Sequence, residues 1–196
     1  MDGPRAPRDT NRHCGPPQNN TLGTMTERAN DSIKWAPLEG GCVCRAVRYR
    51  VEAKPLFVHC CHCRWCQRET GSAFVLNALV EAEQVKVIAG ECEIIDTPSQ
   101  SGKGQKIARC PKCRVALWSN YYWPGPSIRF VRVGTLDDPD RVPPDIHIFT
   151  SSKQRWVVLP RDAVAVTEFY SAKERWPQES LRRAAAARAG KSRAEP

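Results

Sequence analysis

"HCCHCRWCQRETGSAF", residues 59–74, places four cysteines and two histidines within its first eight positions. A second pair of cysteines follows far downstream in "CPKC", residues 110–113. Three kinds of structure explain such crowding of soft ligands: a disulfide framework, a metal site or a reactive thiol. The rest of the chain decides among them.

The chain has 196 residues, of which ten are cysteine. This length suffices for one domain with a real core and additional tails. Residues 1–24 lack the apolar segment of a secretory signal, and no apolar run is long enough to span a bilayer. We therefore expect a soluble cytoplasmic protein without a membrane partner. In a reducing compartment, clustered cysteines are typical of metal ligands or catalytic thiols rather than of disulfides.

The formal net charge is +9, and basic residues outnumber acidic ones in the segment 173–196. We interpret this excess as favouring solubility over nucleic-acid binding, so nucleic acid is not an expected partner. Self-association into a homo-oligomer is left open by the sequence.

Three segments differ in composition. Residues 1–34 are rich in Pro, Asn, Gly and Thr, which predicts a disordered tail. Residues 35–170 contain short β-type runs bounded by Gly, Pro and Asp, which predicts an all-β domain, and the cysteine groups within it predict that the domain binds zinc. The alternation over residues 42–51 predicts one of its strands. Residues 171–196 predict a basic helical or disordered tail, whose helix packs weakly because Leu181 is its one large aliphatic residue.

Four of the cysteines predict a closed metal site. Cys42 and Cys44 are two positions apart in a predicted strand, so both side chains point the same way. Cys110 and Cys113 flank a tight turn of the kind that brings two thiolates onto one metal. Together the four predict a structural zinc ion with a complete tetrahedral shell. A redox pair is the alternative for Cys-x-x-Cys, but the additional Cys-x-Cys and the lack of a βαβ pattern disfavour it.

Three further cysteines, Cys61, Cys63 and Cys66, predict a different metal site. They offer three thiolates on one turn, and a zinc ion with three protein ligands and an open fourth position is typical of a catalytic metal. Such an ion holds an incoming thiol as thiolate or polarises a carbonyl, and three thiolate ligands favour the first role.

The alternative to an open site is a fourth protein ligand, which would make this zinc structural too. The candidates for that ligand are His59, His62 and Cys92. His62 lies between two ligands in an extended stretch and should point away from them.

Candidate substrate-binding residues are Arg68, Ser72 and Trp118. Arg68 lies close in sequence to the predicted open site, where it would pair with a substrate carboxylate; a surface salt bridge is the alternative. Ser72 follows Gly71 in a turn of small residues and offers a hydroxyl. Trp118 begins an aromatic cluster that continues over residues 121–123, for which packing is the favoured interpretation and a cavity wall the alternative. The loops at residues 98–105 and 121–127 are expected to supply the substrate walls.

Five segments in fixed order carry a resemblance to a known family: "GGCVCRAVRY" (40–49), "CHCRWCQRETGSAF" (61–74), "CPKCRVALW" (110–118), "VRVGTLDDP" (131–139) and "HIFT" (147–150). They resemble the glutathione-dependent formaldehyde-activating enzymes, also called S-(hydroxymethyl)glutathione synthase-like. The resemblance implies a β-tent fold of small antiparallel sheets stapled by zinc, with two zinc ions per chain: a structural one on the four cysteines and a second on the three. It also implies a carbon–sulfur lyase reaction, written in reverse, that condenses glutathione with formaldehyde.

Arg114 departs from the family pattern, which usually has glycine after the second cysteine pair. Glycine adopts a left-handed backbone without strain, whereas arginine does so at a cost. Two alternatives to the family activity stay open. One is a zinc-stabilised binding module that uses its basic tail for nucleic acid or an acidic partner; the other is a lyase of the same fold that acts on a different small electrophile.

Overall fold

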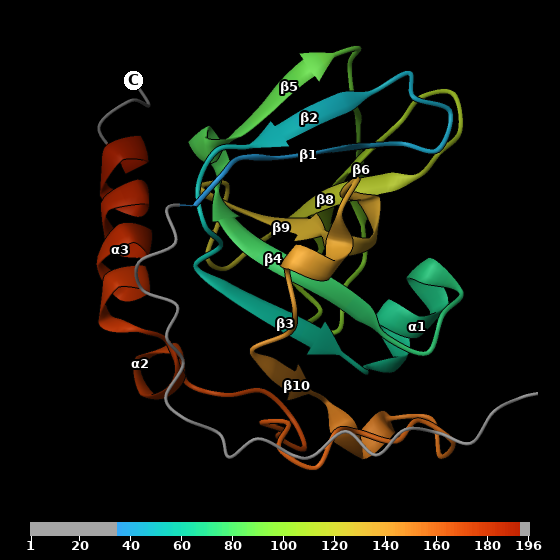
Figure 1. Cartoon of the computed structure of the whole chain (residues 1–196), viewed down its shortest axis with the longest axis vertical. Helices are drawn as coiled ribbons and strands as arrows, with labels where there is room; N and C mark the ends of the chain where they lie inside the picture. Colours follow the sequence, from blue (N-terminus) through green and yellow to red (C-terminus); the bar gives the residue numbers. More distant parts are fainter. Residues whose placement is uncertain (1–34, 193–196) are drawn as a thin grey trace, which may run out of the picture. The chain divides into compact units, whose positions relative to one another are not determined.

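A computed structural model of the protein describes residues 35–192. The tail predicted at residues 1–34 lies outside the described residues. From Trp35 onward the described chain forms one compact unit. This unit is mostly β, with small sheets and few helices, which confirms the all-β part of the predicted fold class (Figure 1).

The strands form two sheets. In the three-stranded sheet all pairs are antiparallel, and in the seven-stranded sheet the β10–β3 pair alone is parallel. The small sheet has the order β1 (Leu38–Gly41), β2 (Arg48–Val51), β5 (Val85–Ala89). The large sheet has the order β10 (Ile146–Ile148), β3 (Phe57–Cys61), β4 (Val75–Glu81), β9 (Ile128–Arg132), β8 (Ala116–Tyr121), β7 (Gln105–Arg109), β6 (Glu93–Thr97).

The helices are short except for the last. The α-helices are α1 (Arg64–Thr70), α2 (Ala172–Arg175) and α3 (Gln178–Ser192), and the 3-10 turns are η1 (Ala82–Gln84), η2 (Val133–Thr135), η3 (Pro139–Arg141) and η4 (Thr150–Ser152). Among residues 35–192, no helix combines the length and apolar character needed to cross a bilayer.

Two apolar cores lie on opposite faces of the large sheet. The first fills the space between the sheets, where the Tyr49 and Trp118 rings meet edge to face with centroids 5.7 Å apart. The second contains Phe57, Phe130 and Trp176. Both cores bury β-branched and aromatic side chains, the residue types that suit a pleated surface.

Strand β3 is buried along its whole length, because it has a core on each face. Val58 points into the first core, whereas Phe57 and Cys61 point into the second. Successive side chains of a strand alternate between faces. The side chains of the cysteine-rich segment are therefore divided between the two faces of the large sheet before the chain turns into α1.

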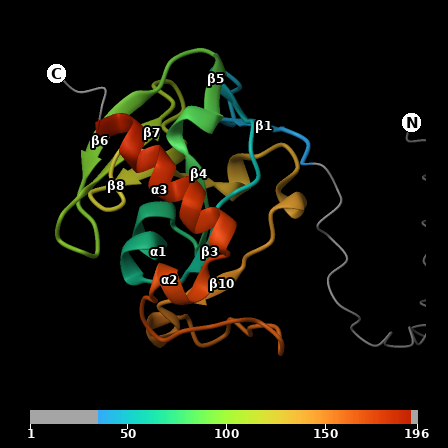
Figure 2. The ribbon, with the colours of Figure 1, turned by 90° about the vertical axis from the view of Figure 1, so that its left-hand side faces the viewer.

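Helix α3 packs on the large sheet more firmly than its composition indicates. Ala184 and Leu181 contribute to the second core, since the small alanine allows close approach. The Arg183 guanidinium donates to both carboxylate oxygens of Glu81 on β4, at 2.7 and 2.8 Å. Figure 2 shows α3 in front of β3 and β4. The ion pair is non-local, so sequence periodicity does not reveal it.

Candidate functional site

Four cysteine sulfurs come together from two turns, one connecting strands of the small sheet and one connecting strands of the large sheet. Cys42 and Cys44 follow β1, and Cys110 and Cys113 lie between β7 and β8. All four are free thiols whose Sγ atoms lie within 4.8 Å of one another. The separations are 3.5 Å between Cys42 and Cys44 and 3.7 Å between Cys44 and Cys110. Sulfurs bound to one tetrahedral zinc ion lie about 3.8 Å apart, so the donor set and its spacing fit a complete zinc shell.

Each of the two turns that carry these cysteines is followed by an arginine with a left-handed backbone. Arg45 has φ 60° and Arg114 has φ 64°, both left-handed. The Arg45 N–H donates to the Cys42 carbonyl and the Arg114 N–H donates to the Cys110 carbonyl, each at 2.9 Å. The prediction that Cys42 and Cys44 lie in a strand is wrong. Strand β1 ends before them, and a turn rather than strand alternation brings their sulfurs together.

Cys61, Cys63 and Cys66 come together where β3 passes into α1. Cys61 is the last residue of β3, and Cys63 is the N-cap of α1. The Cys66 backbone N–H donates to Cys63 Sγ at 3.4 Å. All three side chains are buried, and their sulfurs lie within 4.8 Å of one another.

The three thiols share their protons unequally. Hydrogen bonds from Cys61 and Cys66 lower the pKa of Cys63 to about 3, and the hydrogen bond to Cys63 raises the pKa of Cys61. Three thiolates so close together repel one another, so a bound cation is required to hold all three deprotonated. Three clustered sulfurs fit zinc or another thiophilic ion.

None of the three residues considered as a fourth ligand joins these sulfurs. The His59 Nε2 shares a hydrogen bond of 2.5 Å with the Tyr170 hydroxyl. The His62 Nε2 lies 3.0 Å from the His147 Nδ1, and Cys92 packs against the first core. Within the part of the chain that the structure describes, no further His, Cys, Asp or Glu ligand atom completes the three-sulfur group.

Gln67 fixes the turn that presents the three sulfurs. Its Nε2 donates to the carbonyl oxygens of His62, at 2.6 Å, and Ser152, at 3.0 Å. The Ser152 hydroxyl donates to the same His62 carbonyl at 3.0 Å. Gln67 is buried. Hydrogen bonds therefore hold the turn between β3 and α1 to η4.

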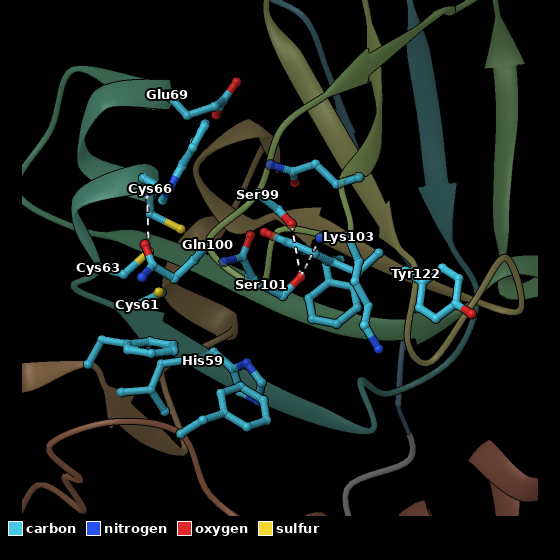
Figure 3. A pocket seen from close by; sticks show the side chains of 18 of the residues that line it. His59, Cys61, Cys63, Cys66, Glu69, Ser99, Gln100, Ser101, Lys103 and Tyr122 are labelled. Atoms are coloured by element: carbon cyan, nitrogen blue, oxygen red, sulfur yellow. Dashed lines mark hydrogen bonds between the residues drawn. The ribbon is translucent and has the colours of Figure 1, made fainter.

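A cavity of about 490 Å³ adjoins the three sulfurs. In Figure 3 the labelled cysteines lie together on one side, and Lys103 and Tyr122 lie across from them. The loops at 98–105 and 121–127 both contribute to the walls, as expected from the sequence. The lining residues are His59, Cys61, Cys63, Trp65, Cys66, Glu69, Asn77, Ser99, Gln100, Ser101, Lys103, Gln105, Tyr121, Tyr122, Trp123, Phe130, Arg132, Ile148, Phe149 and Phe169.

Much of this lining is aromatic. The Tyr121 and Phe130 rings meet edge to face with centroids 4.7 Å apart, and Phe149 faces Phe169. Burial lowers the pKa of His59 to about 3, so its imidazole is neutral at physiological pH. The cavity can exclude water from a small reactant and contact its apolar part.

Two cationic side chains line the cavity. Arg132 is a buried residue of its lining and donates to Ser119 Oγ at 3.1 Å and to Asn77. Glu69 pairs with Arg132 at 3.3 Å and also with Arg109. Because one carboxylate faces two guanidinium groups, this cluster keeps a positive charge. Lys103 adds a second cation from the 98–105 loop, with its Nζ 4.9 Å from the Tyr122 ring centroid.

The three predicted substrate-binding residues do not line the cavity. Arg68 is exposed on α1. Ser72 is also exposed, and its hydroxyl donates to the Phe74 carbonyl at 2.5 Å. Trp118 points into the first core, with the Arg129 guanidinium 4.7 Å from its ring centroid. The structure brings the three cysteines to the cavity but not these three side chains.

Arg132 and Lys103 were missed by the sequence reasoning, as were Phe149 and Phe169. A signal for Arg132 exists in "SIRFVRVG" (127–134), where strand alternation puts Phe130 and Arg132 on one face. No comparable local pattern marks Lys103 or Phe169, because each reaches the cavity from an irregular segment.

Comparison with known proteins finds one matching family model and two similar proteins. The family model described as glutathione-dependent formaldehyde-activating enzyme matches residues 37–152. A curated protein of Halomonas elongata, provisionally named a glutathione-dependent formaldehyde-activating enzyme, is 30% identical over 127 residues, which span 62% of this chain and 80% of that protein. A crystal structure of a Rhodobacter sphaeroides protein is 19% identical and aligns with a TM-score of 0.41, covering 55% of this chain and 97% of that one.

Proposed function

The chain belongs to the glutathione-dependent formaldehyde-activating enzyme family, and from that premise we propose that it forms or cleaves an adduct between a small thiol and an aldehyde. This makes it a zinc-dependent carbon–sulfur lyase. The observation that carries the proposal is the group Cys61, Cys63 and Cys66: three buried thiols at the wall of a cavity, joined by no further ligand residue within positions 35–192.

Both cysteine groups fit a zinc ion, in different ways. The four sulfurs of Cys42, Cys44, Cys110 and Cys113 would enclose a structural ion that links β1 and β2 to β7 and β8. The three-sulfur group would leave one coordination position toward the cavity. Zinc bound there supplies a site that keeps a fourth thiol deprotonated and nucleophilic near neutral pH.

The proposed reaction is an addition and needs no oxidant or reductant. A new bond forms between the thiol sulfur and the aldehyde carbon, and the carbonyl π electrons move to oxygen. The thiol loses one proton and the new hydroxyl gains one. The neutral His59 and the aromatic walls would keep water away while the two reactants meet. Because this addition is already easy in water, orientation in the cavity is the main contribution required of the chain.

The two cations of the cavity favour a thiol that carries a carboxylate. Lys103 and Arg132 lie in the same lining as the three cysteines. Glutathione has two carboxylates and fits this charge pattern. The proposal therefore also places the protein in the cytoplasm, a reducing compartment that supplies such a thiol. The basic-tail alternative is not favoured, because Arg183 is engaged with Glu81 and Arg182 with Glu179.

The test is exchange NMR on a mixture of glutathione and formaldehyde, which interconvert with their adduct. The intact protein should raise the exchange rate above the uncatalysed rate. Cys63→Ser should remove the increase, whereas Cys92→Ser, which alters a cysteine outside both groups, should keep it. An unchanged rate in Cys63→Ser would exclude the three-sulfur site. Acceleration with a different thiol or aldehyde, but none with this pair, would favour the same fold acting on another electrophile.

A further inference from the structure

Two soft ligands of the 59–66 segment are used by neither cysteine group. Cys60 and His62 alternate with Cys61 along an extended backbone, so their side chains leave it on the other side. Cys61 and His59 line the cavity, but Cys60 and His62 do not. They lie on the opposite face of the large sheet.

A third residue joins them from the neighbouring strand. His147 on β10 is the register partner of Cys60 on β3 in the parallel pair. Its neighbours Ile146 and Ile148 point into the second core, so His147 points away from it, toward Cys60 and His62. The two strands therefore deliver three ligand side chains to one place on a rigid sheet.

The distances within this group resemble those around a metal ion. The Cys60 Sγ lies 3.6 Å from the His62 Nε2, and that nitrogen lies 3.0 Å from the His147 Nδ1. Around tetrahedral zinc, a thiolate and an imidazole nitrogen lie about 3.6 Å apart, and two imidazole nitrogens about 3.3 Å. The Cys60–His62 separation already matches, the two histidine nitrogens would need to separate by a few tenths of an ångström, and all three ligand atoms lie within 4.8 Å of one another.

We propose that Cys60, His62 and His147 form a third metal site, for zinc or a similar divalent transition-metal ion, on the sheet face opposite the cavity. One thiolate and two imidazoles are ligands that such ions prefer. Binding replaces the Cys60 S–H proton with a metal–sulfur bond and releases that proton. Both imidazoles stay neutral when they bind: each keeps one ring proton on the nitrogen that does not face the ion, which is Nδ1 of His62 and Nε2 of His147.

The surroundings give an ion access from one side. Cys60 and His62 are buried, with 1% and 0% of their surface exposed, whereas His147 is partly exposed and opens the group to solvent. The Phe74 ring covers His62, with centroids 5.4 Å apart. The nearby Lys153 ammonium donates to the carbonyls of Val157, at 2.5 Å, and of Gln154, at 3.4 Å. Its charge is therefore directed to backbone acceptors.

This site is independent of the proposed function, and a spectroscopic difference separates them. The other two groups hold sulfur ligands alone, so among residues 35–192 imidazole coordinated to zinc would report the third site. The experiment is zinc X-ray absorption on the intact protein, loaded with increasing zinc, together with metal content per chain. We expect an imidazole contribution in the wild type, and its loss together with one zinc ion per chain in His147→Gln.

Cys60→Ser should have the same effect, whereas Cys92→Ser should leave both measurements unchanged. An all-sulfur zinc environment in the wild-type protein at saturating zinc would overturn the proposal, even if the variants failed to fold. Unchanged metal content in a folded His147→Gln would also overturn it. Neither result would bear on catalysis at the three-sulfur site, which is measured by adduct exchange.

Discussion

Gln67 donates a hydrogen bond of 2.6 Å from its Nε2 to the carbonyl oxygen of His62, across the turn that carries Cys63 and Cys66. The same amide group reaches Ser152 in η4. A single buried side chain therefore sets how the turn and its sulfurs are presented to the cavity.

Replacing Gln67 with alanine should weaken both the fold and the metal site. The change leaves the His62 carbonyl with the Ser152 hydroxyl as its remaining side-chain donor, and a buried group that loses its partner costs about 1–3 kcal/mol. We expect a lower free energy of unfolding in urea and faster zinc loss to a chelator. Arg68→Ala, on the exposed side of the same helix, should change neither quantity. Equal zinc loss in the two variants would contradict a positioning role for Gln67.

Glycine in place of Arg45 or Arg114, whose backbones are left-handed, should raise the free energy of unfolding. A left-handed conformation costs a non-glycine residue roughly 1–2 kcal/mol, and the greater freedom of glycine in the unfolded chain offsets about half of that. Arg45→Gly should therefore raise the free energy of unfolding by up to about 1 kcal/mol. Arg114→Gly should raise the free energy of unfolding by less, because the substitution also removes the ion pair between Arg114 and Glu93. Destabilisation by Arg45→Gly would show that the turn does not hold that conformation in solution.

Glu69→Ala should be among the most destabilising substitutions at the cavity. Glu69 and Arg132 are 8% and 7% exposed, so removing the carboxylate leaves a buried guanidinium without its counter-charge. Breaking a buried pair from one side costs about 3–5 kcal/mol. The matched control is Asp96→Ala, whose pair with Lys106 is exposed and should cost about 1 kcal/mol or less. Thermal unfolding of the two variants measures this difference. A similar loss of stability in Glu69→Ala and Asp96→Ala would contradict the burial of the Glu69 cluster.

Arg183→Ala should loosen helix α3 from strand β4. The substitution leaves the buried Glu81 carboxylate without its two hydrogen bonds from Arg183. Hydrogen exchange should then increase across residues 178–190, while the amides of β7 and β8 stay protected. Arg182→Ala, which removes an exposed pair with Glu179, serves as the control. Unchanged exchange in Arg183→Ala would mean that apolar contacts alone hold the helix.

The division of seven cysteines into four and three could be predicted from sequence, because each pair or triplet lies within one short turn. Spacing limits which sulfurs meet when the intervening residues are few. The same reasoning was wrong for the conformation of Cys42 and Cys44, since apolar alternation in residues 47–51 belongs to a strand that starts only at Arg48. A strand and a turn can both bring sulfurs two positions apart together.

The cavity could not be predicted residue by residue, because its walls come from distant segments. Arg68 is close to the cysteines in sequence but lies on the exposed face of α1, whereas Arg132 reaches the cavity from β9. Strand pairing likewise brings His147 beside Cys60. Which strands are neighbours depends on long-range contacts that local periodicity does not contain.

The central claim is that Cys61, Cys63 and Cys66 hold a metal ion, and zinc content per chain in Cys63→Ser tests it most directly. Wild type and variant are purified in parallel, with circular dichroism confirming that both are folded. We predict that the variant contains one zinc ion fewer per chain and has lost the acceleration of adduct exchange. Equal zinc content in the two folded proteins would contradict the account.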